Sequence, residues 1–272
     1  MITSRRNPLV AKLRSLHQAK GRKEQNLILL EGTHLLQECE RLQLEPQLIC
    51  STDIWAQRHP RLLQLAPRQI VSPEVLRAMA STENPDGVVS LLAMPSDLTS
   101  LPLLDLANQP LLLALDRVQD PGNLGTLLRT SLAAGVDQVW LGGGADPWQP
   151  KVLRASAGAV LQLQLKRWPS LVAGISMAKQ SGFQVLAAVQ RGGRPYWEVD
   201  WQLPSVLLLG NEGAGLATEL TDEAQLVTVP HREEVESLNV AVAAGLMLME
   251  RNRQTHRALH GRGESSIAEL YP

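Results

Sequence analysis

The strongest constraint on the fold is a series of short, continuously apolar segments in the second half of this 272-residue chain. Two examples are PLLLALD at 110–116 and SVLLLG at 205–210. A strand buried on both faces has this uninterrupted pattern, and such strands form parallel sheets covered by helices. Helical patterns separate several of the strands. We therefore predict an α/β domain, with further strands in DQVWLGG, LQLQLK, FQVLAAV and LVTVP.

The first part of the chain alternates in the same way on a smaller scale. Strands are expected in NLILLEG, PQLICS, RQIVS and GVVSLLAM, and helices in THLLQECERL and PEVLRAMAS. The segment from Pro95 to Pro110 has three prolines and no sustained period, which is typical of a linker. We predict a small N-terminal α/β domain at 1–95, a linker at 96–109 and a second domain at 110–272.

Charge is distributed unevenly, although the formal net charge is only −1. Residues 1–25 contain one acid, Glu24, and seven basic residues. The basic residues are Arg5, Arg6, Lys12, Arg14, Lys20, Arg22 and Lys23. A local basic face can engage phosphates even on a protein that is neutral as a whole. On charge alone, a phosphate-binding face and a solvated helix face remain equally open.

The two cysteines, Cys39 and Cys50, lack metal-site spacing and do not imply a disulfide framework. A reducing cytoplasm is the simplest setting for them. No apolar run reaches the roughly 20 residues needed to cross a bilayer, so no membrane association is expected. No metal is expected either, because His231 has no companion ligands at suitable spacing.

The stretch DPGNLGTLLRT, residues 120–130, follows an apolar strand and opens a helix. It lacks the G-x-G-x-x-G and acidic residue of a dinucleotide site, which disfavours an oxidoreductase, and it lacks the G-K-[ST] of a phosphate loop. What remains is N-x-G-x-x-x-R, formed by Asn123, Gly125 and Arg129. The Arg129 guanidinium is suited to binding a phosphate at the carboxyl edge of the sheet. The alternative is a surface arginine paired with Asp116 or Asp120.

Two later turns have the same strand, turn and helix arrangement. LLLGNEGAGL, residues 207–216, carries three close glycines around Glu212, and glycine permits backbone approaches that a side chain would block. VPHREEVESLNVAVAAG, residues 229–245, leads into the final helix. Ser237 is a candidate cap for that helix, whereas Asn239 is a polar amide at the head of an apolar helix and requires a partner.

The final helix is expected to begin near Ser237 and to extend to His260. It is apolar nearly all round from Leu238 to Met249 and becomes polar and basic afterwards. A helix that is apolar all round is buried, either inside its own domain or against a partner chain.

Together and in this order, the three turns resemble the SpoU/TrmH family of RNA ribose 2′-O-methyltransferases. The matching segments are NLGTLLRT, LLLGNEGAGL and VPHREEVESLNVAVAAG, and PKVLRASAGAV resembles the segment between the first two motifs. The resemblance covers about the whole second part. NPLVAKLRSLHQAKGRKEQNLILLEGTHLLQE looks like the substrate-binding domain of the ribosomal-RNA members.

The resemblance implies an α/β domain whose carboxyl end is tied into a deep trefoil knot, preceded by a small α/β RNA-binding domain. The knot would bind S-adenosylmethionine, mainly through backbone groups, and the last helix would lie in a homodimer interface. The implied cofactor-binding residues are Leu209, Gly210, Asn211, Gly213, Val229, Pro230, Ser237 and Leu238.

The resemblance also implies a reaction, in which a ribose 2′-hydroxyl attacks the methyl group of the sulfonium. Arg129 would act with Asn123, Glu212, Ser237 and Asn239. Because an arginine side chain stays protonated, we interpret Arg129 as a clamp on the RNA phosphate and not as a base. The RNA-binding set would be the seven basic residues of 1–25 together with Lys151 and Arg154.

The third motif departs from the family pattern, which often has methionine after the proline and glycine two residues later. This chain has His231 and Glu233 at these positions, so a changed cofactor loop is expected if the glycine needs positive φ. Ribosomal RNA is the preferred target because of the added N-terminal domain. The alternatives are transfer RNA as the substrate and a noncatalytic RNA-binding or ribosome-assembly protein.

Overall fold

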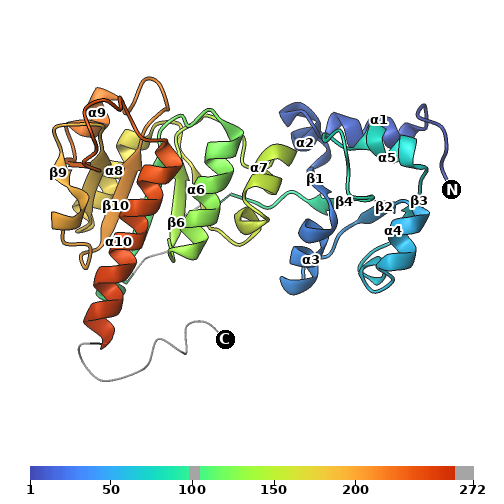
Figure 1. The fold of residues 1–272 in the computed structure, drawn as a ribbon, viewed down its shortest axis with the longest axis horizontal. Helices are drawn as coiled ribbons and strands as arrows, with labels where there is room; N and C mark the ends of the chain where they lie inside the picture. Colours follow the sequence, from blue (N-terminus) through green and yellow to red (C-terminus); the bar gives the residue numbers. More distant parts are fainter. Residues whose placement is uncertain (98–104, 261–272) are drawn as a thin grey trace. The chain divides into compact units, whose positions relative to one another are not determined.

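The computed structural model describes residues 1–97 and 105–260, with side chains as far as Thr255 (Figure 1). The chain forms two compact units. Unit 1 contains Met1–Ser96, Leu124–Arg129 and Ala145–Gln162. Unit 2 contains Asp97–Asn123, Thr130–Gly144 and the chain from Leu163 onwards. Half of the predicted linker at 96–109, residues 98–104, lies outside the described residues, and the predicted domain boundaries stay predictions.

Unit 1 is built on a four-stranded sheet with the order β1-β4-β2-β3. Its strands are β1 Leu27–Glu31, β2 Leu48–Ser51, β3 Arg68–Ile70 and β4 Val88–Ala93. Its helices before β4 are α1 Pro8–Ser15, α2 Ala19–Gln25, α3 Thr33–Arg41, α4 Asp53–Arg58 and α5 Pro73–Met79. Strand β4 is antiparallel to both of its neighbours, and β2 is parallel to β3. Separate apolar clusters cover the two faces of the sheet.

Unit 1 also includes a later segment of the chain, which contains α7 Pro150–Ala155. Two ion pairs hold this segment to β1 and α2. Arg154 Nη1 donates to the buried Glu31 carboxylate at 2.8 Å, and Arg22 donates to Asp146. Gly125 allows close packing in the same unit, because a Cβ there would lie 2.4 Å from the Ala155 Cβ. The glycine of the first motif therefore serves packing.

Unit 2 is built on a seven-stranded sheet with the order β7-β6-β5-β10-β8-β11-β9 and parallel neighbours throughout. The strands are β5 Leu111–Leu115, β6 Gln138–Leu141, β7 Leu165–Arg167, β8 Gln184–Ala188, β9 Arg194–Pro195, β10 Ser205–Leu209 and β11 Gln225–Thr228. The helices are α8 Leu171–Gln180, α9 Thr218–Thr221 and α10 Val240–His260. Helix α6, Pro121–Ala133, contributes its two ends, because Leu124–Arg129 belongs to unit 1. The predicted α/β class and the buried apolar strands are confirmed.

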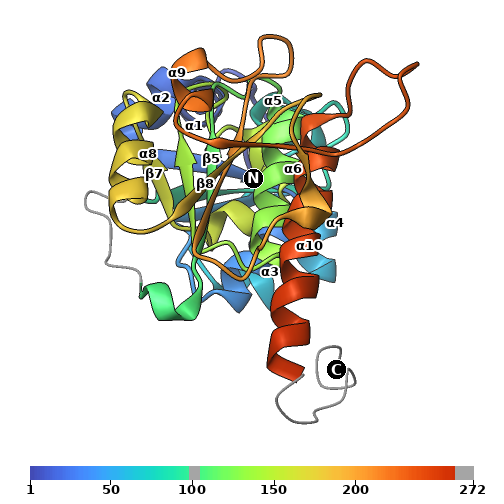
Figure 2. The same ribbon diagram turned by 90° about the vertical axis from the view of Figure 1, so that its left-hand side faces the viewer.

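Helices cover both faces of this sheet (Figures 1 and 2). Helices α8 and α9 pack with β5, β6, β8 and β10 in one apolar cluster, and α10 lies on the opposite face. Gly245 of α10 approaches Thr130 of α6, whose methyl carbon would lie 3.9 Å from an added Cβ. Strand order reverses between β5 and β10, and ligands of open α/β sheets bind at the carboxyl ends beside such a reversal.

Helix α10 begins at Val240, three residues later than predicted, because Asn239 caps it. The Asn239 Oδ1 accepts hydrogen bonds from the backbone N–H groups of Ala241 and Val242 at 2.9 and 3.3 Å. Ser237, the predicted cap, lies before the helix. Within the described part of the chain, no helix combines the length and apolar character needed to cross a membrane.

Arg22 requires a correction, because the prediction that it contacts RNA is wrong. The residue is only 2 % exposed. Its guanidinium donates to the carbonyl oxygens of Leu16 and His17 at 2.8 and 3.0 Å, as well as to the Asp146 carboxylate. A buried guanidinium with these acceptors acts in packing, and it cannot reach a phosphate.

We therefore expect Arg22→Met to lower the free energy of unfolding by about 2–3 kcal/mol, because it removes the cation beside Asp146 and the donor of two carbonyl groups. Urea unfolding measures the change. Lys23→Met, at the exposed next position, should remain within about 0.5 kcal/mol of the wild type. Equal stabilities of the two variants would contradict the structural role of Arg22.

Candidate active site

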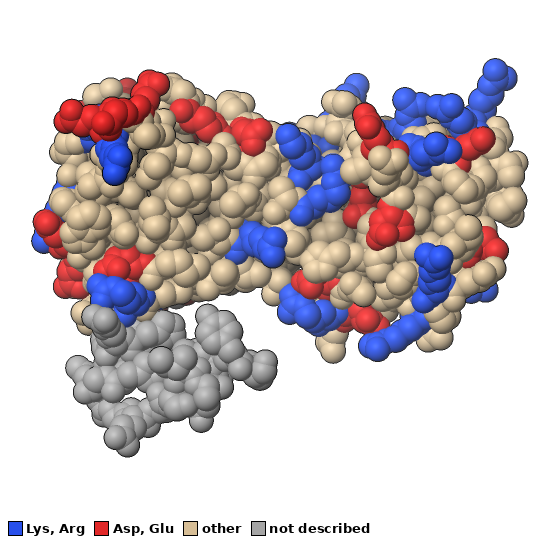
Figure 3. All heavy atoms as spheres, in the orientation of Figure 1, with Lys and Arg blue, Asp and Glu red and all other residues tan. Residues whose placement is uncertain are grey.

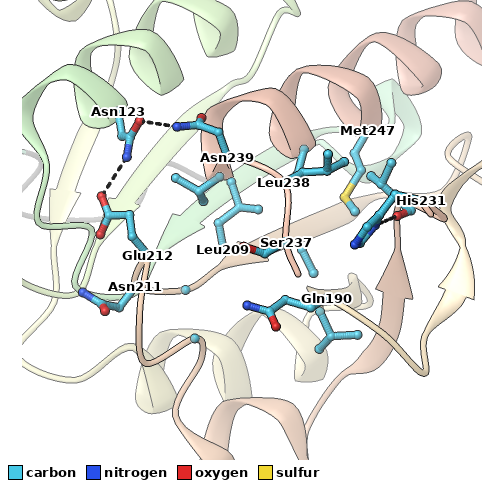
Figure 4. A pocket seen from close by; sticks show the side chains of 17 residues that line it. Asn123, Gln190, Leu209, Asn211, Glu212, His231, Ser237, Leu238, Asn239 and Met247 are labelled. Atoms are coloured by element: carbon cyan, nitrogen blue, oxygen red, sulfur yellow. Dashed lines mark hydrogen bonds between the residues drawn. The ribbon is translucent and has the colours of Figure 1, made fainter. Parts of the chain in front are cut away.

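A pocket of about 230 Å³ opens at the carboxyl ends of β8, β10 and β11 in unit 2 (Figure 4). Its walls are the ends of β8 and β10, the turn after β10, and the segment that joins β11 to α10. Asn123 adds the start of α6. The pocket thus draws on all three motifs of the sequence, at the edge where a parallel sheet binds ligands.

Three polar side chains form a chain of hydrogen bonds along one side of the pocket (Figure 4). Asn123 Nδ2 donates to Glu212 Oε1 at 3.1 Å, and Asn239 Nδ2 donates to Asn123 Oδ1 at 2.9 Å. The Glu212 carboxylate also accepts the backbone N–H groups of Gln119 and Asp120, each at 3.0 Å. Each of the three motifs contributes one member, which fixes their relative positions.

The carboxylate of Glu212 is favoured in its charged form. Burial raises its pKa, but the hydrogen bonds from Gln119, Asp120 and Asn123 outweigh this effect and hold the pKa below its usual value. A charged acceptor for three donors is therefore present at neutral pH.

The turn after β10 requires glycine. A Cβ on Gly210 would lie 2.3 Å from the backbone carbon of Gly215, which no real structure accommodates. Asn211 and Gly215 exchange backbone hydrogen bonds at 3.0 Å, and Gly215 has φ +69°. Asn211 Oδ1 accepts from Gly213 and Ala214, so Asn211 shapes the turn. The resulting tight turn lines the pocket with backbone groups.

The segment between β11 and α10 has a shape that needs no glycine. No residue from Val229 to Asn239 has positive φ, so the departure at Glu233 is compatible with the backbone observed. Arg191 Nη2 donates to the carbonyl oxygens of Glu233 and Val235 at 3.1 and 3.3 Å. The departure at His231 and Glu233, which would favour the noncatalytic alternative if it changed the cofactor loop, therefore gives that alternative no support.

Most of the predicted site residues lie together. Of the predicted cofactor-binding residues, six line the pocket: Leu209, Gly210, Asn211, Val229, Ser237 and Leu238. Gly213 and Pro230 are not among its lining residues. Of the predicted catalytic residues, all but Arg129 line the pocket: Asn123, Glu212, Ser237 and Asn239.

Arg129 is exposed on α6 and has no hydrogen-bond or ion-pair partner among the described residues. The alternative pairing with an acid is not observed. Asp116 pairs with Arg117 at 2.9 Å, and Asp120 caps α6 by accepting the backbone N–H of Asn123 at 2.8 Å. The guanidinium is therefore available to a partner from outside the described chain.

Part of the pocket was not predicted from the sequence. Ala188, Val189 and Gln190 at the end of β8 line it, as do His231 and Met247. The carboxyl end of β8 could have been included, because parallel strands end at one edge of a sheet. Met247 could not, since its helical position reaches the pocket only through tertiary packing.

The predicted RNA-binding side chains of unit 1 are mostly exposed (Figure 3). The exposed ones are Arg5, Arg6, Lys12, Arg14, Lys20, Lys23 and Lys151. Arg154 Nη1 already donates hydrogen bonds to the Glu31 carboxylate and to Ser81 Oγ, the latter at 2.9 Å. Two exposed arginines that the sequence analysis missed, Arg58 and Arg77, line a hollow of about 440 Å³ beside α4 and α5.

We expect Glu212→Gln to lower the free energy of unfolding by about 1 kcal/mol at pH 7, because an amide cannot accept all three hydrogen bonds. The folded-state pKa of Glu212 is lowered, so its contribution is complete above the ordinary value of 4.5 and is lost as the pH falls further. Urea unfolding at several pH values should show the difference from wild type shrinking in acid. Glu236→Gln, an exposed control, should show little difference. A difference in the free energy of unfolding between Glu212→Gln and the wild type that does not depend on pH would contradict this account.

Comparisons with known proteins agree with this geometry. Residues 110–249 match the SpoU rRNA Methylase family, and residues 7–90 match the MRM3-like substrate binding domain. An uncharacterized tRNA/rRNA methyltransferase of Synechocystis is 44% identical over 260 residues, which is 93% of each chain. The 23S rRNA (guanosine(2553)-2′-O)-methyltransferase RlmP of Bacillus subtilis is 34% identical, over 91% of this chain and 97% of its own.

A solved structure extends the likeness to three dimensions. The AdoMet-bound rRNA methyltransferase from Sinorhizobium meliloti has a TM-score of 0.80 and 32% identity, and the match covers 93% of this chain and 97% of that one. The predicted family is confirmed over both parts of the sequence. This chain belongs to the SpoU rRNA methylase family.

Proposed function

We propose that this protein transfers a methyl group from S-adenosylmethionine to a ribose 2′-hydroxyl of ribosomal RNA. The observation that carries the proposal is a single pocket that brings the three motifs together, with Asn123, Glu212 and Asn239 hydrogen-bonded on one side. The relatives named as rRNA methyltransferases support the activity and the target. Transfer RNA is a second candidate, because the Synechocystis relative carries both targets in its name.

The residues of the pocket fit S-adenosylmethionine. The turn at Gly210 leaves no room for a side chain and presents backbone groups instead. Leu209, Val229 and Leu238 supply apolar surface beside it, which suits a flat adenine ring and an aliphatic tail. When bound, the cofactor supplies an electrophilic methyl group on a sulfonium.

The protein's own residues have to align the ribose hydroxyl with that methyl group. Glu212 fixes Asn123, and Asn123 fixes Asn239, so the polar side of the pocket is held rigid before substrate arrives. Such preorganisation lowers the barrier by holding reacting atoms in line. Arg129 has no partner on the described chain and offers a planar, permanently charged fork for a phosphate. We assign it the orientation of the RNA backbone.

The basic face of unit 1 supports RNA as the partner. Apart from Lys20, which pairs with Glu24 at 3.8 Å, the exposed cations of residues 1–25 have no ion pair on the described chain. Each phosphate neutralised by such a cation releases counterions, which strengthens binding to RNA of any sequence.

We infer further that the carboxyl end is knotted and that the reaction takes place in the cytoplasm. The turn after β10 and the segment after β11 lie around one pocket, which supports a threaded chain. Cys39 and Cys50 are free and buried, and burial raises the pKa of each thiol to about 12. Two inert thiols agree with a reducing compartment.

A homodimer through α10 is part of the proposal. Val242, Leu246 and Met249 are 54 %, 40 % and 44 % exposed, and their spacing puts them on one face of the helix. Three large apolar side chains along one exposed helix face are typical of a protein interface. A second copy of this chain is the partner we propose, as the resemblance to the family implies for the last helix.

Arg129→Ala should reduce methyl transfer to RNA by about 100-fold or more, because the substrate backbone loses its clamp. Affinity for S-adenosylmethionine should stay within about twofold, since Arg129 does not line the pocket. Methyl transfer from labelled cofactor and calorimetry give the two readouts. Arg68→Ala, an exposed arginine on β3, is the control and should keep its activity. Full activity of Arg129→Ala would contradict the assignment.

Leu246→Glu should convert a dimer into a monomer, because a charge cannot be buried in an apolar interface without a partner. Sedimentation velocity compares the variant with the wild type. Met177→Glu, on the exposed side of α8, adds the same charge elsewhere and should leave the dimer intact. A monomeric wild type, or a dimeric Leu246→Glu, would exclude this interface.

A further inference from the structure

The hollow of about 440 Å³ beside α4 and α5 has no role in the function described so far. It lies wholly in unit 1. Its lining residues come from the loop after β2, from α4 and α5, and from the loop before β4. Sites of small ligands usually have volumes of roughly 300–1,000 Å³, so a ligand of the size of one nucleotide fits this hollow.

Hydrogen bonds and close packing fix the shape of the hollow. Trp55 Nε1 donates to Thr33 Oγ1 at 2.8 Å, and the backbone N–H of Thr33 donates to the Asp86 carboxylate, also at 2.8 Å. Gly87 has φ +89°, and a Cβ there would lie 3.0 Å from the Trp55 Cβ. These contacts hold α4 and the loop before β4 together, so the hollow is formed before any ligand binds.

An aromatic ring that solvent can reach lines this hollow. The imidazole of His59 lies against the ring of Trp55, with 4.7 Å between the ring centroids and 30° between the ring planes. Trp55 is buried, whereas His59 is only half-buried. A histidine ring that is supported on one side can stack with an unstacked RNA base. Ile54, which is 62 % exposed, adds apolar surface to the same hollow.

Two arginines make the hollow positively charged. Arg58 and Arg77 are exposed, and neither makes an ion pair with a described residue. Among the lining residues, all of which the structure describes, Asp86 is the single acid, and it already accepts two hydrogen bonds from Thr33. A guanidinium binds a phosphate through its planar fork of donors. The charge of the hollow therefore matches the phosphates on either side of a nucleotide.

We propose that the hollow binds one unstacked nucleotide of the RNA substrate, with the base on the imidazole of His59 and the phosphates at Arg58 and Arg77. The proposal rests on the proposed function, because it takes RNA as the substrate. It goes beyond that function because the basic face of residues 1–25 binds phosphates of any RNA, whereas this hollow requires a base that has left its stack. Unit 1 thereby favours single-stranded RNA over duplex RNA.

The test compares two RNA probes of equal length. One is a fluorescently labelled single strand of oligouridylate, and the other is the same strand paired with oligoadenylate, in which the bases stay stacked. Fluorescence anisotropy on the full-length protein measures both affinities. His59→Ala should bind the single strand at least about fivefold more weakly, because the base loses the ring on which it stacks. It should bind the duplex within about twofold of the wild type, since a duplex offers no unstacked base.

Further variants separate base stacking from loop structure. His59→Phe keeps an aromatic ring and should retain the affinity for the single strand within about twofold. Replacing Arg58 and Arg77 by Met should lower the slope of single-strand affinity against salt, on logarithmic scales, by about 0.7 for each arginine. Arg68→Met removes an exposed arginine outside the hollow and is the control, which should keep the wild-type slope. Circular dichroism verifies that each variant is folded.

Each outcome decides the question. The proposal is overturned if His59→Ala weakens both probes equally or neither of them, and the proposed function then still stands as long as the wild type methylates RNA. A loss in His59→Phe as large as that in His59→Ala also overturns it, because the histidine would then only shape the loop. Uridine monophosphate that competes as well as the single strand would assign the hollow to a free nucleotide instead. If the wild type binds neither probe and methylates no RNA, the proposed function fails as well.

Discussion

The site depends on one carboxylate. Glu212 accepts the backbone N–H groups of Gln119 and Asp120, which are 93 and 92 residues away in sequence, together with the side chain of Asn123. Without these hydrogen bonds, only the pairing of β5 with β10 would hold the loop after β5 near the turn after β10. With them, the start of α6 has a fixed position above the carboxyl edge of the sheet. Asn239 extends the same chain of hydrogen bonds to the head of α10.

This arrangement explains how polar groups are tolerated at the start of an apolar helix. Asn239 uses its oxygen to cap α10 and its amide nitrogen to bind Asn123, so both ends of its side chain are satisfied. The need of this amide for a partner was predicted from the sequence, because an unpaired polar group at the head of an apolar helix costs free energy. The partner itself could not be predicted, since it lies 116 residues away.

Features that depend on neighbouring residues could be predicted from the sequence, whereas features that depend on contacts between residues far apart in the chain could not. The uninterrupted apolar sequences of β5 and β10 predicted that both strands are buried. The order of the three motifs sufficed to identify the family. Arg22 shows the limit. It stands in a basic run whose other members are exposed, and only its distant contact with Asp146 marks it as buried. The three apolar side chains exposed on α10 show the same limit, because an all-round apolar pattern is compatible with burial in its own domain as well as against a partner.

The segment between β11 and α10 shows how a site can keep its shape when its sequence changes. A glycine at position 233 would allow the backbone to adopt positive φ, but no residue from Val229 to Asn239 has positive φ. Two side chains hold the loop through its carbonyl groups: Arg191 binds those of Glu233 and Val235, and His231 binds that of Val229. Carbonyl groups held in this way leave the loop with little freedom to collapse into the pocket. Since backbone groups form much of the wall, an unusual side chain such as His231 can be accommodated without loss of the pocket.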